Sequence, residues 1–119
     1  MIELLNNQSP NVIAMKIVGK IEKSDMDGLI KDIQGKLEHV DKLGIYVELE
    51  SFGGISLNAL IEDIKFAFPN LKKFNKKAVV SDKEWLGKVV EVGNKFFPSM
   101  ESRHFSLDQR DEALAWVKE

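Results

Sequence analysis

The sequence lacks cysteine entirely and contains only two histidines, His39 and His104. Without cysteine, the chain has no disulfide, thiolate zinc site, iron–sulfur cluster or thiol nucleophile. The two histidines lie far apart in the chain, and neither has an acidic or histidine partner at the spacing that metal sites use. We therefore expect no cofactor, no metal site and no enzymatic activity.

Long apolar runs and a strong excess of one charge are also missing. No run of about 18 apolar residues is present, which a membrane-spanning helix would require. The first 20 residues lack the apolar core of a signal peptide. The net charge is only −2, whereas general nucleic-acid-binding proteins are strongly basic. These absences predict a cytoplasmic protein that binds no nucleic acid.

The composition is typical of a globular domain, with 44% hydrophobic and 30% charged residues among 119. A chain of this length buries roughly 65% of the surface that its unfolded form exposes. It therefore needs no cross-link in order to fold. No linker, internal repeat or low-complexity segment interrupts the sequence, so we predict a single domain over residues 1–119.

Hydrophobic periodicity predicts three strands and a helix in the first part of the chain. Apolar runs at residues 2–5 and 12–18 flank a polar stretch, which indicates a β-hairpin. Residues 25–38 carry an apolar stripe at helical spacing, and Ser24 is placed to cap this helix. Residues 43–49 alternate in character, as a strand does. One face of this strand, with Tyr46 and Glu48, is expected to be wet or half-wet.

Strands and helices alternate in the rest of the chain as well. Three serines precede apolar stripes and are placed to cap helices, namely Ser56, Ser81 and Ser106. Short segments of strand character come before the second and third of these helices, at residues 78–80 and 103–105. A loop at residues 50–55 leads into the helix that begins at Ser56.

The predicted order is a hairpin followed by strand–helix repeats, which defines an α/β fold. Strands joined through helices run parallel by right-handed crossovers. We therefore expect a mixed, mostly parallel sheet of four or five strands. Because the strands alternate in character and are not apolar on both faces, we expect the helices to lie mainly on one face.

Four stretches of sequence together carry a family resemblance: residues 23–27, 47–57, 78–85 and 110–116. With the element order, they resemble the STAS fold of anti-sigma-factor antagonists, and more closely its SpoIIAA-like branch of uncharacterised bacterial proteins. The resemblance covers essentially the whole chain. It implies a non-enzymatic domain that binds a partner protein or a small ligand. The fold is also compared with Sec14-type (CRAL-TRIO) lipid-binding domains.

The resemblance further implies a phosphorylation site. In anti-sigma-factor antagonists, a serine at the start of the helix after this strand is phosphorylated within an Asp-Ser-Gly type motif. Ser56 matches that serine by position, and Ser51 is a second candidate. Ile55 and Leu57 stand where the family has an acidic or polar residue and a glycine, which favours ligand binding over a phosphorylation switch.

The loop before Ser56 is the predicted ligand site. Gly53 and Gly54 place flexible backbone just before a helix N-terminus, where free amides favour an anion. Open α/β sheets usually bind ligands at the carboxyl ends of their strands, and Phe52 and Trp85 supply apolar surface there. The alternative is that the glycines form a tight turn and Ser56 only caps the helix.

Residues 65–77 contain five lysines, three phenylalanines and no acidic residue. Phe66 falls opposite the apolar stripe of its predicted helix, so it is expected to leave the core. Lysine-rich surfaces with projecting aromatic side chains are attracted to anionic membranes. This pattern predicts reversible contact with the inner membrane surface through Phe66, Lys72, Lys73, Phe74 and Lys76. The alternative is an ordinary solvated lysine face.

Glu48 and Glu50 share a strand face, but neither has a basic or hydroxyl partner nearby in sequence. We expect them to be solvated and not to act as an acid–base pair. The sequence thus predicts a non-enzymatic domain for a small apolar or lipid-like ligand, with reversible membrane association. The alternative is a phosphorylation-regulated protein-interaction module. The oligomeric state stays open, with a homodimer among the alternatives.

Overall fold

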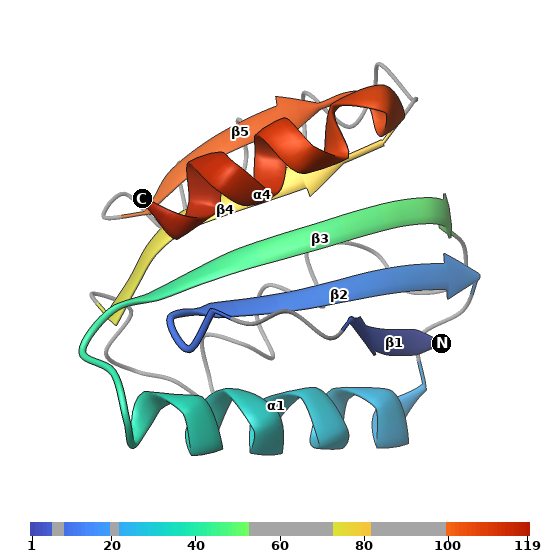
Figure 1. Cartoon of the computed structure of the whole chain (residues 1–119). Helices are drawn as coiled ribbons and strands as arrows, with labels where there is room; N and C mark the ends of the chain where they lie inside the picture. Colours follow the sequence, from blue (N-terminus) through green and yellow to red (C-terminus); the bar gives the residue numbers. More distant parts are fainter. Residues whose placement is uncertain (6–8, 20–21, 53–72, 82–99) are drawn as a thin grey trace.

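A computed structural model describes residues 1–5, 9–19, 22–52, 73–81 and 100–119 (Figure 1). Residues 50–52 are described by their backbone alone. The helices predicted to begin at Ser56 and Ser81 lie outside the described residues.

The described part of the chain forms a five-stranded sheet with strand order β1-β2-β3-β4-β5 (Figure 1). β1 pairs with β2 in antiparallel fashion, and the other neighbouring strands are parallel. The prediction of a mixed, mostly parallel sheet is therefore confirmed. The elements, in chain order, are β1 (Ile2–Leu5), β2 (Val12–Gly19), α1 (Lys23–Leu37), β3 (Leu43–Phe52), β4 (Phe74–Val80), β5 (Glu101–Phe105), the short 3-10 helix η2 (Leu107–Gln109) and α4 (Arg110–Lys118).

Helix α1 begins earlier than its sequence pattern predicted. Its N-cap is Glu22, whose backbone N–H donates to the Asp25 carboxylate over 2.8 Å in a capping box. The same carboxylate accepts a hydrogen bond from the Ile2 backbone at 3.4 Å, so it also connects α1 to β1. The predicted cap at Ser24 is wrong, because the helix already begins at Lys23 and Glu22 is its N-cap, so Ser24 lies within the first turn. The hydrogen bond from the Glu22 backbone lowers the pKa of Asp25.

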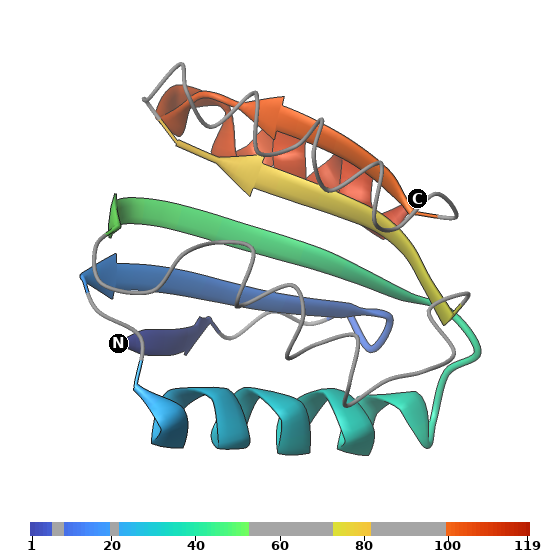
Figure 2. The same cartoon turned by 180° about the vertical axis from the view of Figure 1, so that it is seen from behind.

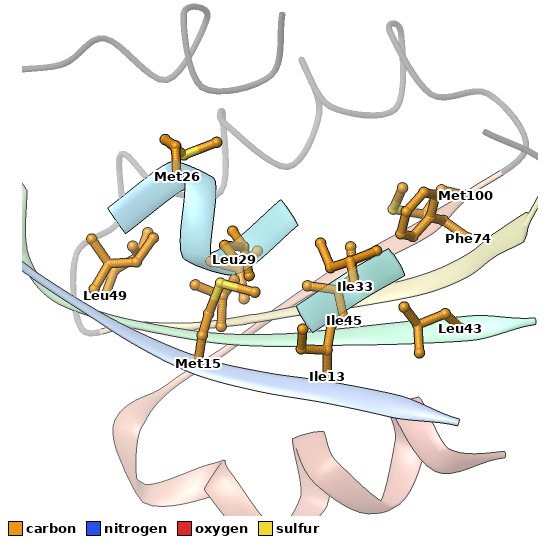
Figure 3. Packing of buried hydrophobic residues seen from close by; sticks show 13 residues of the cluster. Ile13, Met15, Met26, Leu29, Ile33, Leu43, Ile45, Leu49, Phe74 and Met100 are labelled. Atoms are coloured by element: carbon orange, nitrogen blue, oxygen red, sulfur yellow. The ribbon is translucent and has the colours of Figure 1, made fainter. Parts of the chain in front are cut away.

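One face of the sheet is covered by α1 (Figure 3). Met26, Leu29 and Ile33 are the buried residues of this helix, and they match the predicted stripe. They pack on alternate residues of the central strands. These strand residues are Ile13, Met15 and Ile17 of β2 and Ile45, Val47 and Leu49 of β3. The period-two pattern of the strands and the helical period of α1 thus meet in one apolar core.

The other face is covered by α4, which Figure 3 shows on the far side of the strands. Ala113 and Val117 of this helix are fully buried, as predicted. The helix comes very close to β3, because a Cβ added at Gly44 would lie 2.8 Å from the Val117 carbonyl oxygen. Only glycine fits at this crossing without a shift of the backbone.

The expectation of a wet or half-wet face on β3 is wrong. Tyr46 is 4% exposed and Glu48 is 8% exposed, because α4 covers the side of the strand that α1 leaves open. Among the described elements, one helix lies on each face, as both views of the chain show (Figure 1, Figure 2). Two further predicted helices lie outside the described residues, so the expectation that the helices lie mainly on one face stays a prediction.

Two strands are longer than their sequence patterns suggested. β3 continues through residues 50–52, which were expected to form a loop. β4 begins at Phe74 and not at residue 78, so it takes in the end of the lysine-rich segment. Lysine has a low propensity for strands. In β4, the hydrogen-bonded pairing with β3 and β5 outweighs this propensity.

Candidate functional site

Most of the predicted ligand site falls outside the described residues. Gly53, Gly54, Ser56 and Trp85 are not described, and Phe52 is known only as the last residue of β3. Ser51 lies in the same strand, paired in register with Val18 of β2. The ligand and phosphorylation assignments at these residues stay predictions.

Two residues of the predicted membrane contact, Phe74 and Lys76, are not exposed. Phe74 is fully buried in the core beneath α1, so its inclusion in a membrane surface is wrong. The Lys76 side chain is only 18% exposed. Its Nζ donates to the Trp116 carbonyl oxygen over 3.2 Å and to Glu119 over 3.4 Å. The cause in both cases is that β4 begins at Phe74, which places these side chains against the two helix-covered faces.

Two other members of that surface, Phe66 and Lys72, lie outside the described residues. Lys73 is described and exposed. Membrane association stays a prediction, and the structure neither supports nor contradicts a role of Lys73 in it. None of the described helices is long and apolar enough to cross a bilayer.

A cleft of about 590 Å³ lies between the hairpin and the second half of α1. The sheet contributes an apolar side to this cleft, and the helix contributes a mostly polar side. The lining residues are Leu4, Leu5, Ile13 and Ala14 from the hairpin, and Lys31, Asp32, Gly35, Lys36 and His39 from α1 and the turn after it. Binding sites for small molecules commonly have this size and this combination of an apolar wall with a few polar groups.

Leu4 is one of the large hydrophobic side chains that the described structure leaves exposed, at 44%. It lines the cleft from β1, a short strand at the sheet edge. A ligand with an apolar part would cover this surface and remove it from water, which is favourable in proportion to the area covered.

The helical side of the cleft carries more positive than negative groups. Lys31 and Lys36 line it together with a single carboxylate, Asp32, and with His39. Lys31, Asp32 and Lys36 lie along one side of α1, and His39 follows in the turn after the helix. Gly35 lies between the lysines, and no atom is found within 4 Å of a Cβ built there. This glycine therefore opens the cleft next to its charged groups.

The sequence pattern alone does not point to this cleft. A polar stripe on a helix opposite its apolar stripe is normally a solvated surface, and Lys31, Lys36 and His39 fit that description by themselves. Only the tertiary placement of Leu4 across from them reveals a concave site. Gly35 is one of two glycines within the helix, with Gly28, and glycine in a helix interior costs stability.

A second polar group lies beneath α4. The Tyr46 hydroxyl donates to Glu48 Oε1 over 2.6 Å, and Arg110 Nε donates to the same oxygen over 3.1 Å. The expectation that Glu48 is solvated is therefore wrong, because a hydroxyl on its own strand and a guanidinium from α4 both satisfy its carboxylate. Burial, followed by the hydrogen bond to Glu48, raises the pKa of Tyr46 far above its usual value.

This cluster connects α4 to the sheet and has no geometry for acid–base catalysis. Its only nitrogen base is a guanidinium, which stays protonated, and its phenol is held in the protonated form. The described residues also include no group of three histidine, aspartate or glutamate side chains that could hold a metal ion. The cleft, and not this cluster, is the candidate site.

The fold and sequence together define the class of protein. Residues 12–118 match the family described as SpoIIAA-like, and the chain belongs to that family. A similar crystal structure is that of an uncharacterised protein of the DUF3478 family, with a SpoIIAA-like fold, from Shewanella loihica PV-4. It is 26% identical, with a TM-score of 0.68, over 98% of this chain and 92% of that one. No curated protein matches the sequence.

Proposed function

We propose that this protein is a non-enzymatic binding domain for a small molecule with an apolar part and an anionic group. The site is the cleft between the hairpin and α1. The observation that carries the proposal is the exposed Leu4 surface in a 590 Å³ cleft that also holds Lys31 and Lys36. The SpoIIAA-like fold is typically non-enzymatic, which agrees with this proposal.

The two sides of the cleft would make different contributions to binding. An apolar chain that removed about 100 Å² of apolar surface from water would gain about 2.5 kcal/mol. A lysine contact to an anionic group would strengthen this and would depend on salt, because both lysines lie on the helix surface. We expect a lipid-like carboxylate, such as a medium-chain fatty acid, to bind with its tail toward Leu4.

The test uses decanoate as the probe and two glycine variants of α1. Gly35→Met fills the cleft, whereas Gly28→Met places the same side chain on the same helix away from it. A Cβ meets no atom within 4 Å at either position, so both variants should fold. We expect Gly35→Met to weaken decanoate binding by at least about tenfold, or 1.4 kcal/mol, in calorimetry. Gly28→Met should bind like the parent.

Lys36→Met tests the charged side of the cleft. It should weaken decanoate binding and reduce the salt dependence, while leaving the binding of decanol unchanged. Equal decanoate affinity in the parent and in both Gly35→Met and Lys36→Met would exclude the cleft as the site. Native mass spectrometry of the purified parent protein would show a retained ligand and any dimer in one measurement.

The second candidate function is a protein-interaction module regulated by phosphorylation, as in anti-sigma-factor antagonists. Membership of the SpoIIAA-like family supports it. The candidate serines are Ser56 and Ser51. Phosphate found on either serine in protein isolated from its native cells, together with loss of partner binding in Ser56→Asp, would favour this function over ligand binding.

A further inference from the structure

Lys77 and Ser102 stand opposite each other on neighbouring parallel strands. They are Cα partners in the register of β4 and β5, and Lys77 is also the partner of Ile45 in β3. Cα partners on adjacent strands share one face of a sheet and lie about 4.8 Å apart. Ile45 belongs to the core beneath α1, so Lys77 and Ser102 share that face of the sheet.

Both residues have unused hydrogen-bonding capacity. Ser102 Oγ is buried and has no hydrogen-bond partner within the described part of the chain, which is uncommon for a buried hydroxyl. Asn75 Oδ1, two positions before Lys77 on β4, is buried without a partner as well. The Asn75 oxygen only accepts hydrogen bonds and so would not bind an anion, whereas the Ser102 hydroxyl, across from Lys77, is able to donate one.

Lys77 contrasts with its neighbour Lys76. Lys76 points to the opposite face, where it contacts Glu119 and lies 5.0 Å from the centre of the Trp116 ring. Lys77 is partly buried and has no acidic partner among the described residues. Burial lowers the pKa of Lys77, with no compensating negative charge. A lysine held away from water without a counter-charge is unfavourable unless another group supplies one.

We propose that Lys77 and Ser102 form a second, inner binding site for a small oxyanion. The ammonium group supplies the positive charge and the hydroxyl donates a hydrogen bond, so one carboxylate or phosphate group satisfies both. His104, two residues after Ser102, is the nearest other titratable side chain by register on this face, and its Nε2 is 3.0 Å from the Ser81 carbonyl oxygen. This site lies across the sheet from β1 and is distinct from the cleft.

The proposal is tested by titrating the protein with inorganic phosphate and, separately, with acetate, and by following the backbone amide resonances of β4 and β5 by NMR, which every variant retains. Lys77→Met should weaken oxyanion binding by at least about tenfold and Ser102→Ala by about threefold, because each removes one of the two donors. Lys73→Met removes an exposed lysine from the same segment and serves as the matched control. Its affinity should equal that of the parent.

The two probes distinguish the sources of the anion. Tighter binding of phosphate points to a phosphorylated ligand, and tighter binding of acetate points to a carboxylate. Gly35→Met should leave both titrations unchanged, so a failure of the cleft and a failure of this site give different results. Lys77→Met removes a buried charge and should fold. If Lys77→Met does not fold, the oxyanion affinities of Ser102→Ala and Lys73→Met are compared instead. Absence of binding, or binding that is equal in the parent, Lys77→Met and Ser102→Ala, would overturn the proposal.

Discussion

The two faces of the sheet are held to their helices by different kinds of contact. On the α1 side, large aliphatic side chains such as Leu29 and Ile33 pack on the strands, and the core beneath this helix is apolar. On the α4 side, the buried residues are mostly smaller, and Arg110 forms an ion pair with a carboxylate of β3. The α1 face therefore depends on buried area, and the α4 face depends on close approach and on directional bonds.

This difference has a consequence for how each helix tolerates change. Apolar packing is non-directional, so a core of aliphatic side chains accepts replacements of similar volume. Hydrogen bonds and a backbone crossing at glycine have strict geometry. We expect α1 to be sensitive to loss of volume, and α4 to be sensitive to changes that would matter little elsewhere in the protein.

The largest effect is expected on the α1 face. Ile33 is 1% exposed, so Ile33→Ala should lower the free energy of unfolding by about 3 kcal/mol, through lost burial and the cavity that remains. Ile33→Val should cost about 1 kcal/mol and serves as the graded control. Urea denaturation measures both. A loss below 1 kcal/mol for the alanine variant would contradict the view that α1 is held by buried area.

At the crossing of α4 and β3, Gly44→Ala should cost about 2 kcal/mol, because the added Cβ meets backbone and cannot be accommodated by a rotamer change. Gly28→Ala on α1 is the matched control. Its Cβ meets nothing within 4 Å, and alanine favours helix over glycine by up to about 1 kcal/mol. A lower free energy of unfolding for Gly44→Ala and a higher one for Gly28→Ala would support the difference between the two helices. Equal changes in the two variants would contradict it.

The ion pair beneath α4 should have a smaller effect. Arg110→Met leaves the buried Glu48 carboxylate with Tyr46 alone and should cost about 1.5 kcal/mol, a modest figure because the Arg110 side chain is 51% exposed. Adding Glu48→Gln should recover part of this loss, since no buried charge then remains unpaired. A double-mutant cycle measures the coupling. Strict additivity would show that the pair does not fix α4.

The smallest effect concerns pH. Tyr46 is the single tyrosine of the chain, so tyrosinate absorbance reports on it alone. Its folded pKa is raised above the unfolded value of about 10. The protonated Tyr46 therefore contributes its full share of the free energy of unfolding below about pH 10. That contribution falls as the pH rises, by about 1 kcal/mol near pH 10.7. Tyrosinate should appear only as the protein unfolds, and Tyr46→Phe should abolish this alkaline loss of stability. Ionisation of Tyr46 in folded protein would contradict its burial beneath α4.

Local patterns in the sequence determined much of this fold. The hairpin, the apolar stripe of α1 and the helix cap at Ser106 were all predicted and are all present. The helical stripe and the cap depend on residues within about four positions of one another, and the hairpin pairs two strands that follow each other directly in the chain. The family also follows from the sequence, because its pattern extends over residues 12–118.

Tertiary structure alone decided that Glu48 and Phe74 are buried and where a ligand could bind. Glu48 looks solvated until Arg110, 62 positions later, brings α4 over it. Phe74 looks exposed until β4 pairs with β3 and places it beneath α1. The cleft exists only because Leu4 of the hairpin lies across from Gly35 of the helix. Such contacts join residues distant in the chain, and no local period records them, because burial depends on what a neighbouring element covers.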